Sequence, residues 1–194
     1  MKSTKKLFLL LLILTTFSCS YLPEPLTKDA ELIIEENAEY ITLTTSKTDK
    51  TKAGIIFYPG GLVDTNAYVS SFEKLVVEDN RMLIIVKATA NLAIINSQKA
   101  SKIISKIDDV NQWIVGGHSL GASVTCIDAF NNPESFEALF LLAGYSINDL
   151  SETDLPVLSI TASNDEVLDL EKLEENKANF PEPMIINSPD EIAN

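Results

Sequence analysis

The stretch that most constrains the fold of this chain is residues 116–121, which read Gly-Gly-His-Ser-Leu-Gly. An apolar run precedes it over residues 113–115, and small residues follow over 122–126, so the pattern predicts a strand, a tight turn and a helix. Glycine on both sides of the serine permits close backbone approach, and the turn leaves the Ser119 hydroxyl exposed above a sheet. Ser119 is therefore the candidate nucleophile.

A serine hydroxyl is a weak nucleophile that needs a neighbouring base, ordinarily a histidine, to take its proton. The chain contains one histidine, His118, directly before the serine. Neighbouring side chains on such a turn project in different directions, so we expect His118 to shape the turn or to contact the pocket. The sequence thus predicts a nucleophile without an evident base.

Short β-rich runs alternate along the chain with stretches of helical spacing, which predicts βα units on a mostly parallel sheet. The predicted strands are residues 40–44, 53–58, 82–87, 112–116, 138–142, 156–161 and 184–186. The predicted helices are residues 67–78, 98–107, 120–130 and 168–179. We expect one minimal α/β domain over residues 38–194, with helices on both faces of the sheet and no cap domain.

The N-terminus predicts export. Three lysines among the first six residues precede an apolar run over residues 7–14, which is too short to span a bilayer comfortably. A basic start, a short apolar run and a small residue, here Ser18, are typical of a secretory signal peptide, which we assign to residues 1–18. Residues 19–37 contain two prolines among polar residues and predict an extended spacer.

Cys19 follows the predicted cleavage region, in a pattern that resembles the lipobox of bacterial lipoproteins. We therefore expect a mature chain that begins at a lipidated Cys19 and is anchored to a membrane of the cell envelope. The alternatives are an ordinary signal peptide cut near Ser18 or Ser20, which would give a secreted protein, and an uncleaved anchor.

Composition excludes several classes of function. A formal net charge of −13 disfavours binding to nucleic acid. One histidine and two separated cysteines do not suit a zinc site, and we expect neither a metal nor an organic cofactor. With Cys19 lipidated, Cys126 has no disulfide partner, and we expect a small thiol packed in the core.

Two loops after predicted strands carry further candidates. Gly60 and Gly61 follow the strand at 53–58, and a backbone N–H from one of them, together with that of Leu120, would hold a developing oxyanion. Asp165 follows the strand at 156–161 and would be the acid that orients a histidine. The plainer alternatives are a Pro-Gly turn for the first loop, and for Asp165 the cap of a helix that begins near Leu168.

These motifs together resemble the α/β-hydrolase superfamily, and within it small bacterial hydrolase-like proteins that are exported or lipid-anchored. The strings that carry the resemblance are residues 56–64, 90–93, 116–121 and 155–160, in that order. It extends over residues 38–187 and implies Ser119 as nucleophile and Asp165 as acid. That family places its catalytic histidine in a Gly-Asn-His motif after the last strand and covers the sheet with a further helix. Residues 187–194 contain no such motif, so we expect a C-terminally truncated form.

Two functions follow as hypotheses. The first is a serine hydrolase of carboxylic esters by descent, with an open site for small acyl groups and with activity weakened by the lack of a catalytic histidine. The alternative is a non-catalytic exported lipoprotein, a pseudoenzyme or truncated gene product, that acts as a binding module. The sequence does not predict the oligomeric state.

We predict that the full chain, expressed in a bacterial host, partitions into the detergent phase of a two-phase extraction, because a diacylated cysteine adds a strong apolar anchor. Mass spectrometry should find Cys19 as the lipid-modified first residue. Cys19→Ser should move the protein to the aqueous phase, whereas Cys126→Ser should leave it in the detergent phase. A water-soluble mature chain cut after Ser18 or Ser20 would contradict the anchor.

Overall fold

The computed structural model describes residues 32–88, 91, 93–162, 165–182 and 184–187. In that part of the chain, eight strands form one sheet in the order β1-β2-β4-β3-β5-β6-β7-β8. The strands are β1 (Leu32–Glu36), β2 (Tyr40–Thr45), β3 (Gly54–Tyr58), β4 (Leu83–Val86), β5 (Trp113–His118), β6 (Ala138–Leu142), β7 (Val157–Ile160) and β8 (Ile185–Asn187). The segments predicted as signal peptide and lipidation site, residues 1–18 and Cys19, lie outside the described residues.

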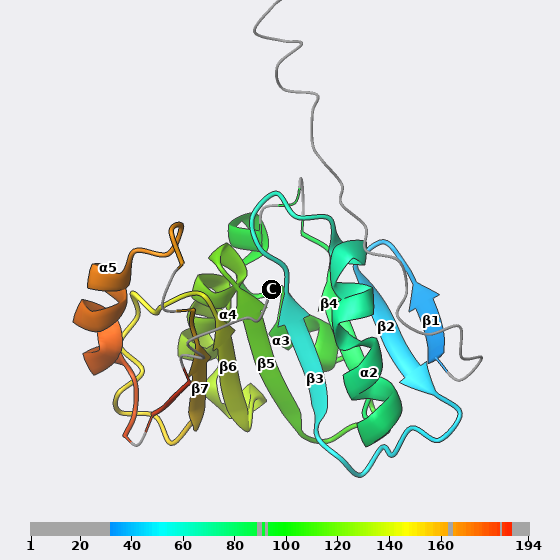
Figure 1. Cartoon of the computed structure of the whole chain (residues 1–194). Helices are drawn as coiled ribbons and strands as arrows, with labels where there is room; N and C mark the ends of the chain where they lie inside the picture. The colour runs from blue at the N-terminus through cyan, green and yellow to red at the C-terminus, as the bar shows by residue number, and fades with distance from the viewer. Residues whose placement is uncertain (1–31, 89–90, 92, 163–164, 183, 188–194) are drawn as a thin grey trace, which may run out of the picture.

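Strands β3 to β8 are parallel to one another, and β2 runs against both β1 and β4. Every residue of β3 and β4 is buried, as expected for parallel strands covered on both faces. Tyr58 lies opposite Gly117, and His118 lies opposite Leu142, so β3, β5 and β6 end at the same level. Their carboxyl ends share one edge of the sheet, marked by the arrowheads of β3 and β5 in Figure 1. The loops that follow these strands therefore meet where α/β folds bind ligands.

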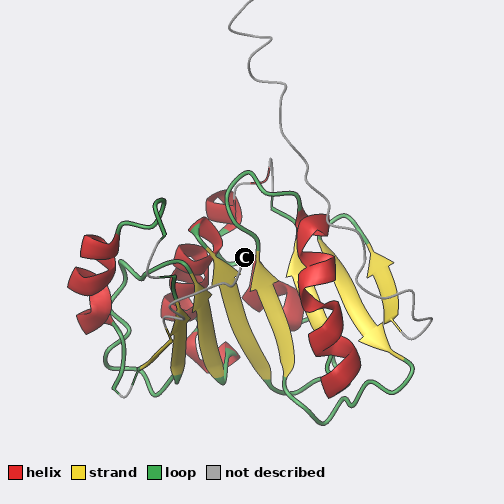
Figure 2. Ribbon diagram, in the orientation of Figure 1, coloured by secondary structure: helices red, strands yellow, loops and turns green. Residues whose placement is uncertain are grey.

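Helices cover both faces of the sheet, with α2 on one face and α3 and α4 on the other (Figure 2). Side chains of β3 alternate accordingly: Phe57 packs in one apolar cluster with Phe72 of α2, and Ile56 packs in a second cluster with Val124 of α4. The α-helices are α2 (Val69–Asp79), α3 (Lys99–Ile104), α4 (Leu120–Asn131) and α5 (Leu170–Glu175). The 3-10 helices are η1 (Thr65–Tyr68), η3 (Ala93–Asn96), η4 (Pro133–Ser135) and η5 (Asn176–Asn179).

This arrangement confirms the predicted fold class, and each of the seven predicted strands is present. The predicted helix at 98–107 is shorter, since α3 covers Lys99–Ile104, and the one at 168–179 is divided into α5 and η5. Cys126 lies buried in the core, and burial raises the pKa of its thiol to about 12. In the described part of the chain, no helix is long and apolar enough to cross a membrane.

The N-terminal boundary of the domain needs a correction. Strand β1 lies inside the segment 19–37, for which the sequence predicts a spacer, so the sheet begins by Leu32 and not near residue 38. The Asn37 side chain makes the turn into β2 by accepting the N–H groups of Glu39 and Tyr40, at 2.7 and 2.9 Å. Sequence pattern does not reveal β1 because Ile33 and Ile34 on this edge strand stay 43% and 52% exposed.

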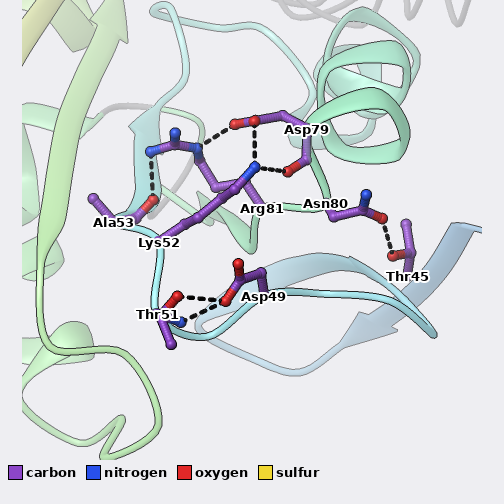
Figure 3. Close-up of polar contacts among 8 residues, drawn as sticks. All are labelled: Thr45, Asp49, Thr51, Lys52, Ala53, Asp79, Asn80 and Arg81. Atoms are coloured by element: carbon purple, nitrogen blue, oxygen red, sulfur yellow. Dashed lines mark hydrogen bonds and ion pairs between the residues drawn. The ribbon is translucent and has the colours of Figure 1, made fainter.

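Polar side chains join the opposite, amino edge of the sheet to the end of α2 (Figure 3). Lys52 Nζ donates to the carboxylate and to the carbonyl of Asp79, at 2.7 and 2.6 Å. Arg81 Nε donates to the same carboxylate at 2.6 Å, and Arg81 Nη1 donates to the carbonyl of Ala53 at 2.7 Å. The two cations hold the pKa of Asp79 below its usual range. This cluster fastens the end of α2 beside the entry to β3.

A fully buried carboxylate, Asp128 of α4, connects three elements on the other face. It accepts hydrogen bonds from the Tyr58 hydroxyl at 2.7 Å, from Ser101 N–H at 3.1 Å and from the Asn132 side-chain amide at 3.0 Å. The Tyr58 hydroxyl in turn accepts Ala100 N–H at 2.7 Å. Burial and the charge of Asp128 raise the pKa of Tyr58 far above its usual value. The network therefore joins the end of β3 to α3 and α4.

We predict that Asp128→Ala lowers the free energy of unfolding by about 3 kcal/mol or more, because removing one member of a buried charged network usually costs roughly 3–5 kcal/mol. Urea denaturation monitored by circular dichroism would measure the loss. Asp109→Ala is the matched control, since Asp109 makes only an exposed ion pair with Lys50 and should cost less than about 1 kcal/mol. Equal losses of unfolding free energy in the two variants would contradict a stabilising role for this network.

Candidate active site

Ser119 occupies a strained turn between β5 and α4. Its φ of 52° and ψ of −119° lie outside the regions that non-glycine residues ordinarily adopt, and such a conformation costs about 1–3 kcal/mol. Hydrogen bonds hold the turn in place: Ser119 N–H donates to the carbonyl of Leu142 at 2.8 Å, and the Ser119 carbonyl accepts Ala122 N–H at 2.9 Å. The structure thus places the candidate nucleophile on a sharp elbow at the carboxyl edge of the sheet.

Two glycines make this elbow sterically possible. A Cβ on Gly117 would lie 2.3 Å from the carbonyl of Gly121, and a Cβ on Gly121 would lie 2.2 Å from the carbonyl oxygen of Tyr58. Either methyl group would collide with backbone, which has nowhere to move. The requirement for glycine at these two positions therefore comes from backbone packed directly against backbone.

The loop after β3 lies against the start of α4, as the contact of Gly121 with the Tyr58 and Pro59 carbonyls shows. Gly60 N–H donates to the Tyr68 hydroxyl at 2.9 Å. Within the described ranges, the N–H groups of Gly61 and Leu120 have no acceptor. Of the two glycines predicted as oxyanion donors, only Gly61 has an N–H that is still available. The N–H of Leu120 is available as well.

His118 faces the loop after β3. Its Nδ1 lies 2.9 Å from the Tyr68 hydroxyl, and a Cβ built on Gly60 would lie 2.7 Å from the same nitrogen. Burial lowers the pKa of His118 below 6.5, and the charge of Asp165 acts in the opposite direction, toward a higher pKa. Among the described residues, no side chain makes a hydrogen bond with the Ser119 hydroxyl. Adjacency to the serine therefore does not bring this imidazole into a serine–histidine hydrogen bond.

Asp165 stands in the loop between β7 and α5. One oxygen of its carboxylate accepts the N–H groups of Val167 and Leu168, at 2.8 and 2.9 Å, and these bonds lower the pKa of Asp165, with a smaller contribution from His118. The helix cap is a different residue, because α5 begins after Asp169, whose side chain accepts Lys172 N–H at 3.1 Å. Asp165 thus folds its own loop instead of capping the helix. Ser163 and Asn164, its neighbours, lie outside the described residues.

A pocket of about 470 Å³ brings Ser119, His118 and Asp165 together with Leu120. Its size lies within the range typical of small-molecule sites. The remaining lining residues are Ser123, Ala143, Gly144, Tyr145, Val167, Leu168 and Asp169. Gly60 and Gly61 do not line it, so their loop borders the elbow from the side of β3. In the described part of the chain, no group of His, Cys, Asp and Glu side chains is suited to hold a metal ion.

Sequence reasoning missed two parts of this site. Tyr68, the last residue of η1, lies at the start of the helix predicted over 67–78, and its hydroxyl contacts Gly60 N–H and His118 Nδ1. Ala143–Tyr145 line the pocket directly after β6, and Ala143 has a φ of 49°. The signal for this segment was its position after the strand next to β5, since residues at the carboxyl ends of adjacent parallel strands share one edge.

The sequence of this chain matches a known family profile, and its fold is similar to solved structures. Residues 54–187 match the sequence profile described as "Alpha/beta hydrolase family". No curated protein sequence matches the chain significantly. Among solved structures, alpha/beta hydrolase domain-containing protein 10 from mouse is 18% identical, with a TM-score of 0.55, over 82% of this chain and 89% of that chain.

Two microbial structures are also similar. Est1E from Butyrivibrio proteoclasticus has a TM-score of 0.60 at 12% identity, over 83% of this chain and 90% of that chain. A predicted CIB-like hydrolase from Thermoplasma acidophilum has a TM-score of 0.62 at 12% identity, over 81% of this chain and 86% of that chain. At these identities the likeness establishes the fold alone.

We predict that NMR titration of the single histidine yields a pKa below 6.5, and that Asp165→Asn lowers it further because the stabilising negative charge is lost. Asp169→Asn is the control. It removes a carboxylate that lines the same pocket but does not contribute to the pKa shift of His118. Since the unfolded chain would bind the proton first, His118 should support stability above pH 6.5, and this support should decline as the pH falls toward the native pKa. A pKa at or above 6.5 would contradict the burial of the His118 imidazole.

Proposed function

Because this chain belongs to the alpha/beta hydrolase family, we propose that it hydrolyses small carboxylic esters through Ser119. The observation that carries the proposal is the elbow itself. Ser119 is held in a costly backbone conformation, opens into a pocket of about 470 Å³, and directly precedes Leu120, whose N–H has no acceptor among the described residues. Strain of this kind persists where the surrounding structure holds it, and it concentrates at functional sites.

In the proposed reaction, Ser119 Oγ attacks the ester carbonyl, and its proton passes through solvent water to the departing alkoxide. The C–O bond to the alcohol breaks, the alcohol leaves, and an acyl-serine forms. The carbonyl oxygen takes up negative charge in the tetrahedral intermediate and accepts the N–H groups of Gly61 and Leu120. Each such donor is worth roughly 10²–10³ in rate in serine hydrolases. Leu120 begins α4, a helix of 12 residues, whose positive N-terminal dipole adds to the same stabilisation. Water then attacks the acyl-serine and releases the acid.

The charge of the pocket favours uncharged or cationic esters as substrates. Asp165 and Asp169 both line it, and none of its described lining residues is a lysine or arginine. Backbone hydrogen bonds keep Asp165 ionised at neutral pH, while burial keeps His118 neutral. A substrate with a carboxylate or phosphate near its ester would therefore be repelled.

We propose slow turnover for this chain. Its single histidine is engaged by Tyr68, and in the described part of the chain the Ser119 hydroxyl makes no hydrogen bond to a base. Serine hydrolases that lose one member of the triad keep about 10³–10⁴-fold rate acceleration over water, from binding and the oxyanion hole. Asp165 holds the place of the acid, with its charge acting on His118.

The second candidate function is a non-catalytic binding module. It is favoured by the same observation, that the Ser119 hydroxyl has no hydrogen-bonded base among the described residues. In that case the pocket retains the shape of the hydrolase site but binds its ligand without cleaving it. For either function we propose an exported protein tethered through Cys19, as the N-terminal pattern predicts.

Hydrolysis of p-nitrophenyl acetate by the purified chain tests the proposal. We expect weak turnover that Ser119→Ala lowers further, because the variant lacks the attacking oxygen and keeps only the acceleration that binding and the oxyanion hole provide. Ser105→Ala removes an exposed hydroxyl at the end of α3 that does not line the pocket, and this variant should turn over like the wild type. Equal rates for the wild type and Ser119→Ala would reject the hydrolase and favour the binding module.

A further inference from the structure

The Tyr68 hydroxyl lies between the loop after β3 and the histidine of the elbow. Gly60 N–H donates to it at 2.9 Å, and His118 Nδ1 lies 2.9 Å on its other side. Its ring is held by Phe57, with centroids 5.0 Å apart, and lies 6.0 Å from the imidazole. One phenol thus contacts both segments that border Ser119 on this side.

Counting protons assigns the direction of these bonds. A phenol has one proton to donate, and its oxygen already accepts Gly60 N–H. If Tyr68 donates to Nδ1, both groups are satisfied, and the imidazole carries its proton on Nε2. If Nδ1–H donated instead, the proton of Tyr68 would have no acceptor among the described residues.

The electrostatics agree with the first arrangement. Burial raises the pKa of Tyr68 and lowers that of His118, so both groups are neutral near pH 7 and Tyr68 keeps its proton. The charged groups that face the imidazole are few: Asp165 acts on it from the loop after β7, and Asp169 lines the same pocket. Neither carboxylate approaches the Tyr68 side of the ring closely enough to form a hydrogen bond.

We infer that Tyr68 is a positioning residue, which holds His118 in the Nε2–H tautomer and fixes the loop after β3 so that Gly61 N–H, not Gly60 N–H, is left for the oxyanion. The tautomer follows from the hydrogen bonds alone, whereas the role toward the oxyanion rests on the proposed ester hydrolysis. It also means that Nδ1 of His118 is occupied and does not take the proton of Ser119.

The single histidine makes the tautomer directly measurable. In the chain labelled with ¹⁵N-histidine, long-range ¹H–¹⁵N spectra at pH 8 should show an unprotonated Nδ1 and a protonated Nε2. Tyr68→Phe keeps the ring against Phe57 but removes the hydroxyl, so the two nitrogens should shift toward each other as the tautomers mix. Tyr40→Phe, which removes a hydroxyl from β2, should give the wild-type spectrum.

A protonated Nδ1 in the wild type would overturn the inference, and so would a Tyr68→Phe spectrum identical to that of the wild type. If Tyr68→Phe fails to fold, the wild-type spectrum alone decides the tautomer. In the ester assay, Tyr68→Phe should lower kcat about tenfold with little change in KM, since the loop loses its anchor while the pocket is retained. An unchanged kcat with altered nitrogen shifts would reject the role toward the oxyanion.

The two proposals fail in different ways. If the wild type shows no turnover that depends on Ser119, ester hydrolysis is rejected and the oxyanion role of Tyr68 falls with it. The spectra of the wild type and of Tyr68→Phe still confirm or reject the pairing of Tyr68 with His118.

Discussion

Backbone packed against backbone at the carboxyl ends of β3 and β5 is the constraint on which the rest of this structure depends. Gly121 lies so close to the Tyr58 carbonyl that no side chain fits between them. Tyr58 also sends its hydroxyl to Asp128, seven residues further along α4, which is two turns of the helix. The same residue of β3 therefore fixes α4 at two points. That double attachment holds the strained φ of Ser119, because a helix free to rotate would let the turn relax.

The hydrogen bonds around the elbow differ between its two adjacent side chains, His118 and Ser119. His118 lies opposite Leu142 in the sheet, and its Nδ1 is directed to Tyr68, on the side of the loop after β3. Ser119 follows with a positive φ of 52°, which turns the chain sharply between the two residues. The two neighbouring side chains therefore make different contacts. The His118 imidazole contacts Tyr68, which supports the loop after β3, whereas the Ser119 hydroxyl makes no hydrogen bond to the described residues.

Much of the fold was predictable because buried parallel strands have continuous apolar runs, as in β3 and β4, and because the glycines around Ser119 mark a turn that few other sequences can form. Strand β1 was not, since it lies at the edge of the sheet and its isoleucines stay partly exposed. The choice between Gly60 and Gly61 was not predictable either. It depends on the hydroxyl of Tyr68, whose position is set by packing against Phe57 and not by any local pattern. Asp165 shows the same limit: its place after a strand was readable, but Asp169 as the helix cap was not.

Asp165 and His118 have different charge states at neutral pH, and each state has its own cause. Two backbone N–H groups hold Asp165 in its ionised form, and burial holds His118 neutral. In a serine triad the imidazolium formed during attack is stabilised by the carboxylate. Here the Asp165 carboxylate already attracts positive charge on His118. However, Nδ1 of His118 is occupied by the Tyr68 hydroxyl, which in turn accepts a hydrogen bond from Gly60 N–H. Proton transfer to this nitrogen would require Tyr68 to leave and would free Gly60 N–H at the same time. The coupling of Tyr68 to both segments therefore works against the use of Nδ1 of His118 as a base.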